Sequence, residues 1–556
     1  MFYFIVLLFT CAYAQNATVN TTQGPVQGAL ATDGNYYVFY GIHYAGTTSG
    51  ANRFKAPSPP PAYPGVFHAI DSSIICAHPT PRGIVGVEDC LVLNIHTRNT
   101  TTPKPVMVIL LGDEYSSIDI KQYSYRRLVE SDVVVVTMNY RLSIFGFLCL
   151  GVPEAPGNAG LKDVVQGLRW IKENIAGFGG DPNNVLLFGH GSGAAMVDLI
   201  TLSPLAANLT HKAITHSGSA LAPWAIAYEP VKNAQIFAEQ LSYTGETPAG
   251  LASKLVNTDI SLFSSALQSI TFLNNSVLFA PCIENKALND SFLTEAPIDI
   301  IKSGNYSHIP YIAGYTDREG TIRSGEAVHG GWLERMQSNF TDFIQVDLGF
   351  NTTASKTAVA NNIRSFYWDN RVINMETITD FLSYHGDTIV VVSVIRGARE
   401  RALTSTAAVR LLEFTYRGTR NSDWLYHQIP IDGVWHGAIL NYLFDYDLKA
   451  EDETARQSLV RRFVSFANTG EPTNDQVTWQ PIYPAVFNYL LYAGDSSTAL
   501  VTLQESGRVN PHSNRMSFWD NVYYSYYVPP TPVSSADHVF GFAFVIALAQ
   551  IVLAHL

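Results

Sequence analysis

Charged residues and recognisable binding fingerprints are scarce in this sequence. Only 15% of the 556 residues are charged, and 47 acidic against 35 basic residues give a formal net charge of −12. This balance argues against a nucleic acid partner, because phosphate backbones bind basic surfaces. We find no metal-ligand spacing, phosphate loop or dinucleotide fingerprint, so we expect no metal and no cofactor. The 47% hydrophobic content predicts a large buried core.

Cysteine is also rare, with five in the chain. Cys11 falls in the N-terminal apolar segment. Cys76 and Cys90 enclose a short loop containing proline and glycine, the kind of loop that an extracellular disulfide closes. Cys149 and Cys282 have apolar surroundings, so we expect buried structural thiols there. Four free thiols are the alternative, which an oxidising compartment disfavours.

Residues 1–14 are predicted to be a secretory signal peptide. The run from Phe2 to Cys11 is apolar, and Ala12-Tyr13-Ala14 supplies the small residues that a signal peptidase needs, although no basic residue precedes the run. The mature chain is therefore expected to begin near Gln15.

A second apolar segment covers residues 539–556, after a Pro- and Ser-rich stalk at 528–538. A membrane span takes about 20 apolar residues, so this tail could cross a bilayer. No Lys or Arg follows it as a cytoplasmic flank, whereas Ser534, Ser535 and Ala536 suit a lipid-anchor (GPI-type) attachment site with a short spacer. We favour the lipid anchor. Either alternative puts the body on the extracellular face of the plasma membrane.

Glycosylation acceptor triplets support an extracellular location. Single triplets arise by chance, but their number beside a signal peptide predicts a glycoprotein. Nine asparagines meet the pattern: Asn16, Asn20, Asn99, Asn208, Asn274, Asn289, Asn305, Asn339 and Asn351.

The body reads as one α/β domain over residues 15–527. Continuous apolar runs at 105–111 and 133–138 predict strands buried on both faces, as in parallel sheets. Apolar residues between Leu161 and Ile175 recur at helical spacing, and another strand is predicted from Val185. Strand, helix and strand in this order indicate an α/β sheet.

Several motifs in sequence resemble the type-B carboxylesterase and cholinesterase family. They are Phe39–Ala45 with Arg53-Phe54, Glu88–Asn94, Asn139–Leu142, Pro156–Asp163 and Gly177–Pro182. The resemblance covers nearly the whole body. It implies an α/β-hydrolase fold with a large, mostly parallel central sheet flanked by helices, and it makes Cys76–Cys90 the family's first disulfide.

The turn that carries the nucleophile in this family usually reads F-G-E-S-A-G-A. Phe188 to Ala194 match it without a gap, which puts Gly191 on the nucleophile and Ser192 on the following alanine. The turn needs small residues two before and two after its centre, and Gly189 and Gly193 meet this only around Gly191. We therefore expect no nucleophile at Gly191, and we expect the Ser192 hydroxyl to point away from the reaction site.

The remaining catalytic positions follow from the same resemblance. The family's oxyanion stretch H-G-G-G corresponds to Leu111-Gly112-Asp113-Glu114, so only Gly112 keeps a bare backbone, and two carboxylates would repel a developing oxyanion. Glu319 matches the triad acid and His436 the base, in the chain order of this class. No catalytic residue is expected to be functional, and Glu319 and His436 are vestigial.

The sequence favours an extracellular, surface-anchored relative of the esterases that has lost catalysis. The family includes adhesion proteins without the serine, so the leading hypothesis is binding of an extracellular protein partner. One alternative is a pseudo-esterase that binds a small apolar ligand. The other is an active carboxylic ester hydrolase that uses Ser192.

Overall fold

The computed structural model describes residues 17–118, 123–419, 421, 429, 432–444, 448–495 and 502–533. The predicted signal peptide, Asn16, the lipid-attachment residues 534–536 and the apolar tail at 539–556 lie outside the described residues.

A mostly parallel sheet forms the centre of the molecule. Its inner strands are parallel, because helical crossovers connect them, and strands at both ends pair antiparallel. In the described residues the sheet has 11 strands, in the order β16 (Thr502–Val509), β15 (Asn488–Asp495), β14 (Val409–Thr415), β13 (Tyr311–Thr316), β12 (Lys212–His216), β11 (Gly180–Gly191), β9 (Lys104–Gly112), β10 (Val134–Met138), β8 (Val92–Thr97), β4 (Tyr37–His43) and β3 (Ala29–Leu30).

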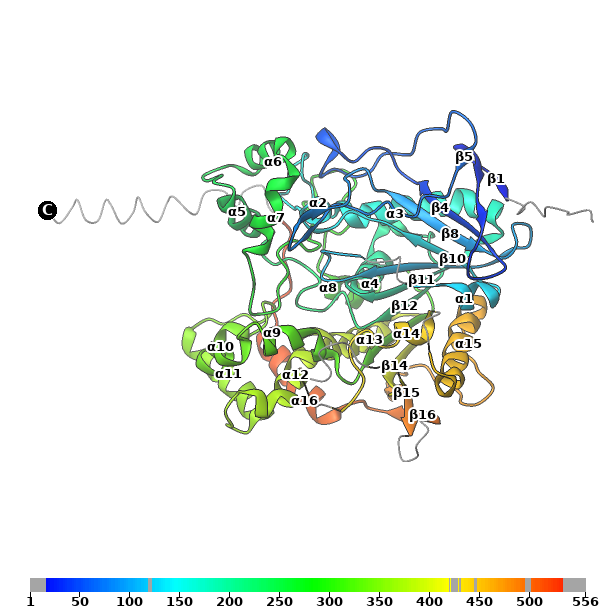
Figure 1. The fold of residues 1–556 in the computed structure, drawn as a ribbon. Coiled ribbons are helices and arrows are strands. Elements are labelled where there is room, and N and C mark those ends of the chain that lie inside the picture. Colours follow the sequence, from blue (N-terminus) through cyan, green and yellow to red (C-terminus); the bar gives the residue numbers. More distant parts are fainter. Residues whose placement is uncertain are drawn as a thin grey trace, which may run out of the picture.

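Helices cover both faces of this sheet (Figure 1). On β9, Val106, Val108 and Leu110 join the core that includes α3 (Ala159–Asn174), α4 (Ser192–Leu202) and α13 (Val392–Thr404). The alternate residues of β9 face a second core with α1 (Arg126–Glu130), α14 (Leu440–Leu443) and α15 (Glu453–Thr469). Because successive strand residues point to opposite faces, a strand covered on both sides is apolar throughout.

Smaller elements complete the fold. Figure 1 shows α5 to α7 and α9 to α12 on the left of the view, on the side where the strands of the central sheet end. Two minor sheets contain β1 (Thr18–Thr21), β2 (Gly24–Gln27) and β5 (Phe67–His68), and β6 (His78–Thr80) and β7 (Gly83–Val85). The other helices are α2 (Ser143–Phe147), α5 (Pro230–Gln240), α6 (Pro248–Asn257), α7 (Phe263–Gln268), α8 (Pro297–Ser303), α9 (Ser324–Val328), α10 (Trp332–Ser338), α11 (Thr353–Trp368), α12 (Ile378–Gly386) and α16 (Ser513–Tyr526).

The predicted α/β-hydrolase architecture is confirmed. The two apolar runs are β9 and β10, and the helical pattern is α3. The α3 helix is buried on more than the predicted stripe, because its polar Lys162 and Asp163 are paired with buried partners, Glu284 and Arg141.

The part of the chain that the structure describes contains two disulfides. Cys76–Cys90 is present as the resemblance implied. The expectation of buried structural thiols at Cys149 and Cys282 was wrong about the thiols, because these two residues form a disulfide with a Cα–Cα distance of 6.6 Å. Their apolar surroundings were read correctly, but a separation of 133 residues gave no local sign of pairing.

The C-terminal segment folds back onto the body before the described residues end. The backbone N–H of Val528 donates to the Asp347 carbonyl at 2.9 Å, and that of Val533 donates to Ile283 at 2.9 Å. The buried Val533 side chain packs on the Cys149–Cys282 disulfide. The first part of the predicted stalk is therefore held against the domain.

The glycosylation triplets within the described residues lie at the surface, with one exception. Asn274 is half-buried. The exposed ones are Asn20, Asn99, Asn208, Asn289, Asn305, Asn339 and Asn351. Within the ranges that the structure describes, one helical stretch, Met375–Thr404, is long and apolar enough to cross a membrane, but 83% of its apolar window is buried in the body, as in the core helix of a globular domain.

Candidate functional site

Gly191 occupies the sharp turn between β11 and α4. Its φ of 60° and ψ of −128° lie outside the regions that side-chain-bearing residues prefer. A Cβ on Gly189 would approach the Gly193 carbonyl oxygen to 2.4 Å, and one on Gly193 would approach the Leu110 carbonyl oxygen to 2.1 Å. The two flanking glycines are therefore required by close backbone packing around a turn centred on Gly191.

The predicted triad acid and base come together beside this turn. Glu319 follows β13 and is fully buried, and its Oε2 lies 2.5 Å from Nδ1 of His436. Its other oxygen accepts hydrogen bonds from Ser217 Oγ at 2.6 Å and from the Thr316 backbone at 2.7 Å. A Cβ on Gly191 would lie 3.9 Å from Nε2 of His436, and 2.8 Å from the Gly112 carbonyl oxygen, which would have to shift. A hydroxyl carried by residue 191 would thus come within reach of the imidazole, and the glycine supplies none.

The charges of this pair support one another. Burial alone would lower the pKa of His436, but the carboxylate of Glu319, its hydrogen bond and the nearby Asp113 raise it above its usual range. Burial likewise opposes ionisation of Glu319, and the charge and hydrogen bond of His436 nevertheless lower its pKa. The pair therefore favours an imidazolium beside a carboxylate.

Glu319→Gln should lower the pKa of His436, because the variant removes the opposite charge and the charged hydrogen bond that support the imidazolium. In the wild type, the raised pKa of His436 stabilises the fold fully below its ordinary value of 6.5, and this contribution is lost as pH rises through the folded pKa. A histidine-selective NMR titration checks the shift. An unchanged His436 midpoint would show that Glu319 does not set its protonation.

The loop after β9 differs from a bare oxyanion-binding backbone. The Asp113 N–H already donates to the Ser117 carbonyl at 3.1 Å. Glu114 and Tyr115 have φ values of 47° and 58°, in the left-handed region that favours glycine. Burial, reinforced by Glu114, raises the pKa of Asp113, whose carboxyl lies near His436. One donor is occupied and acidic side chains line the place where negative charge would develop.

Ser192 lies at the first position of α4 and is buried. Its Oγ accepts a hydrogen bond from the Tyr115 backbone at 3.1 Å and is the atom that a Cβ on Gly112 would meet at 2.6 Å. Among the described residues, no hydrogen bond joins Ser192 to His436. The hydroxyl faces the loop after β9, where it fixes the backbone.

These residues line one narrow pocket, the inner pocket, with a cavity volume of about 20 Å³. It contains all the predicted site residues except the buried Glu319: Gly112, Asp113, Glu114, Gly191, Ser192 and His436. Sequence reasoning missed its other lining residues, Ser217, Trp224, Ile322, Arg323, Ile389 and Val390. Ser217, which donates to Glu319, could have been predicted from its position directly after β12, because the carboxyl ends of parallel strands lie along the same edge of the sheet. Arg323 carried no such signal.

Two further buried histidines adjoin His436. The His190 ring centroid is 4.8 Å from that of His436 and 5.7 Å from that of His216. Burial lowers the pKa of both, that of His216 to about 4, so they stay neutral. Within the described ranges, no group of three or more His, Cys, Asp or Glu residues is arranged to hold a metal ion.

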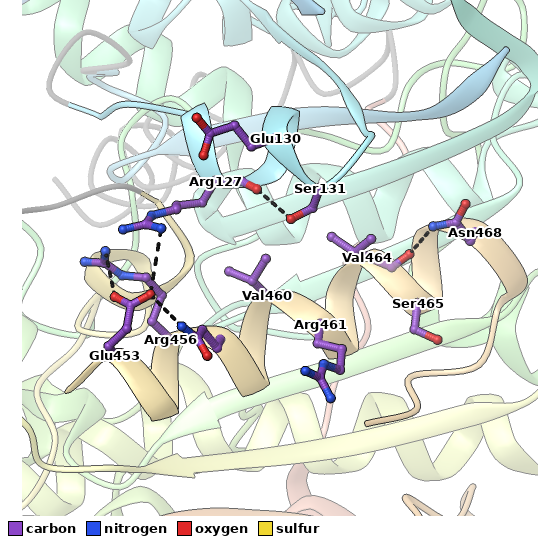
Figure 2. A pocket seen from close by; sticks show the side chains of 11 residues that line it. Arg127, Glu130, Ser131, Glu453, Arg456, Val460, Arg461, Val464, Ser465 and Asn468 are labelled. Carbon is purple, nitrogen blue, oxygen red and sulfur yellow. Dashed lines mark hydrogen bonds and ion pairs between the residues drawn. The ribbon is translucent and has the colours of Figure 1, made fainter. Parts of the chain in front are cut away.

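A separate pocket lies between α1 and α15 (Figure 2). The guanidinium groups of Arg127 and Arg456 turn toward Glu453, at 3.8 and 3.4 Å. None of the residues predicted from the sequence lines this pocket, so the inner pocket remains the candidate site.

Comparisons with known proteins agree with this architecture. A sequence model described as "Carboxylesterase family" matches residues 15–519. The chain is 29% identical over 539 residues to a "Carboxylic ester hydrolase" of Bombus ignitus, covering 92% of this chain and 95% of that protein. It is 28% identical to "Venom carboxylesterase-6" of Apis mellifera, covering 91% and 94%. Juvenile hormone esterase from Manduca sexta, solved with OTFP covalently attached, superposes with a TM-score of 0.81 at 24% identity, covering 92% of this chain and 100% of that chain.

Proposed function

We propose that this chain, which belongs to the carboxylesterase family, keeps the family's site as a binding pocket but does not hydrolyse esters. In this proposal the protein acts at the extracellular face of the membrane by binding, either a protein partner, as in adhesion, or a small apolar ligand. In this proposal the turn at Gly191 and the Glu319–His436 pair are retained because they stabilise the fold around the pocket.

One observation carries the proposal. A side chain at position 191 would begin 3.9 Å from Nε2 of His436, but residue 191 is glycine and has no hydroxyl. An imidazole held by a carboxylate performs acyl transfer only when it has a hydroxyl to deprotonate. The occupied Asp113 N–H and the surrounding carboxylates independently weaken an oxyanion site.

Ester hydrolysis through Ser192 is the second candidate, and the names of the relatives favour it. The proteins of Bombus ignitus and Apis mellifera are both named as esterases, and Ser192 lines the inner pocket. This reaction would require the Ser192 hydroxyl to leave the Tyr115 N–H and turn toward His436.

The two candidates separate in one assay. We expect the purified ectodomain to hydrolyse 4-nitrophenyl acetate no faster than buffer, and we expect Ser192→Ala to leave that rate unchanged. Turnover that disappears in Ser192→Ala and remains in the matched Ser338→Ala variant would establish the hydrolase instead. Ser338 is suitable because it is exposed and its hydroxyl donates to carbonyls of its own helix, those of Glu334 and Arg335.

The surface location belongs to the same proposal. Cleavage after residue 14, one domain over 15–527 and a lipid anchor near 534–536 would leave a glycosylated body attached by a short stalk. Release of the protein from intact cells by a phosphatidylinositol-specific phospholipase supports the lipid anchor, and retention supports a membrane-spanning tail. Binding of the ectodomain to cells would favour a protein partner over a small ligand.

A further inference from the structure

A second pocket adjoins the inner pocket on the outside. This outer pocket has a cavity volume of about 290 Å³, against about 20 Å³ for the inner pocket. Glu114 and Arg323 line both pockets. Their side chains form an ion pair between Glu114 Oε1 and Arg323 Nη2, so the pair stands where the two pockets meet.

Arg323 is fixed from several directions. Its Nη1 binds Glu326 at 3.1 Å, and its Nε donates to Asn275 Oδ1 at 3.0 Å. Its guanidinium carbon lies 5.6 Å from the centre of the Trp332 ring, and the side chain is only 11% exposed. A guanidinium held by three polar partners and an aromatic ring has little freedom to swing aside for a ligand.

Glu114 is also held from its own loop. Its backbone is in the left-handed region, with a φ of 47°, and the following residue, Tyr115, is bound to Ser192 through its N–H. The family motif has glycine at this position, so the carboxylate of Glu114 is an addition to the site. Compared with the family motif, the site therefore gains a carboxylate that pairs with a buried arginine where the two pockets share their lining.

We propose that the Arg323–Glu114 pair is a partition that confines ligands to the outer pocket and keeps them away from Gly191 and His436. This inference rests on the proposed function, since a protein that turns over esters must admit them to His436. With this partition, a protein of this family can bind a ligand without bringing it into contact with the Glu319–His436 pair.

The lining of the outer pocket selects the ligand by charge. Its wall combines apolar side chains with the hydroxyl-bearing residues Ser116, Ser143, Thr271 and Ser276. The apolar side chains are the buried Phe279 and Trp332 and the half-buried Leu267, Ile270, Phe272, Val277 and Leu278. Its charged groups are Glu114, Glu326 and Arg323, so the single guanidinium is already matched by two carboxylates. A ligand carboxylate would be desolvated beside these two without a free cation, which is unfavourable. The outer pocket therefore takes a neutral molecule that has an apolar chain and a polar group able to accept hydrogen bonds, and it rejects the corresponding acid.

A fluorescence titration tests the ligand class. Trp332 lines the outer pocket, so methyl laurate should change the tryptophan emission of the wild-type ectodomain, and Trp332→Phe should remove that change. We expect methyl laurate to bind about tenfold more tightly than laurate, because like charges oppose the acid. Equal or tighter binding of laurate, or no response to the ester, would overturn the assignment.

A chemical labelling experiment tests the partition itself. Diethyl pyrocarbonate modifies neutral imidazoles, and peptide mass spectrometry reports the rate at His436. We expect Glu114→Gly to raise that rate severalfold, with a fold made easier by glycine at a positive φ. The matched variant Glu326→Gln, which leaves the Arg323–Glu114 pair in place, should label like the wild type.

The pH dependence of labelling separates access from basicity. An opened partition raises the high-pH plateau of the His436 rate, whereas a changed pKa moves only the midpoint. Equal plateaus in the wild type and Glu114→Gly would overturn the partition. Ester turnover by the wild type would contradict the proposed function whatever the labelling rates, so the two failures are distinguishable.

Discussion

Gly191→Ser alone should leave ester hydrolysis at or near the buffer rate. The new hydroxyl would begin within reach of His436, but the oxyanion would still face Asp113 and Glu114. The Asp113 N–H would remain bound to the Ser117 carbonyl. Loss of one oxyanion donor costs about 10² to 10³ in rate, so a restored nucleophile without a restored oxyanion hole should recover little of the hydrolysis rate. Initial rates with 4-nitrophenyl acetate measure the effect.

The combined variant Gly191→Ser, Asp113→Gly, Glu114→Gly should be faster than Gly191→Ser by at least about 100-fold, because it restores both the nucleophile and the glycine backbone of the hole. Glycine also relieves the left-handed conformation at position 114. The matched control is Asp113→Gly, Glu114→Gly with Gly191 retained, which should stay inactive. Substantial activity of Gly191→Ser by itself would show that the loop after β9 does not spoil the site.

Asp163→Ala should lower the free energy of unfolding by about 3–5 kcal/mol, the usual cost of leaving one partner of a buried ion pair alone. Asp163 accepts three hydrogen bonds from Arg141, from the backbone N at 3.1 Å, Nε at 2.8 Å and Nη2 at 2.6 Å. The side chains are 2% and 0% exposed. Without the carboxylate, a buried guanidinium loses its counter-charge. Urea unfolding followed by circular dichroism measures the loss.

A matched surface pair provides the control for this measurement. Arg399 and Asp520 also pair at 2.6 Å, but their side chains are 37% and 38% exposed. Exposed pairs contribute about 0–1 kcal/mol, so Asp520→Asn should change stability little. Equal effects of Asp163→Ala and Asp520→Asn would mean that burial does not determine the cost.

The fold could be predicted well because the motifs that resemble the family contain residues that hold the fold together. Arg53 binds Glu88 through Nε at 2.6 Å and accepts from Arg141 at its carbonyl oxygen, and Arg141 binds Asp163. Four residues from four separate motifs thus form one connected network. Together with the apolar runs of β9 and β10, these local patterns determine the central sheet.

The turn at Gly191 could be located from sequence for a similar reason. The close approaches that require glycine at 189 and 193 are local, and local packing leaves a short-range pattern. The Cys149–Cys282 bond, the Arg323–Glu114 pair and the position of Ser217 depend on residues that are far apart in sequence. The tertiary fold determines their partners, so no short-range sequence pattern predicts these contacts.

Covalent labelling tests the central claim, that the site lacks a nucleophile, most directly. The ectodomain would be incubated with an alkyl fluorophosphonate, which phosphonylates an activated serine, and its intact mass and peptides would be measured. The account predicts no adduct on the wild type and an adduct at position 191 of the combined variant. A stoichiometric adduct on Ser192 of the wild-type protein would contradict it.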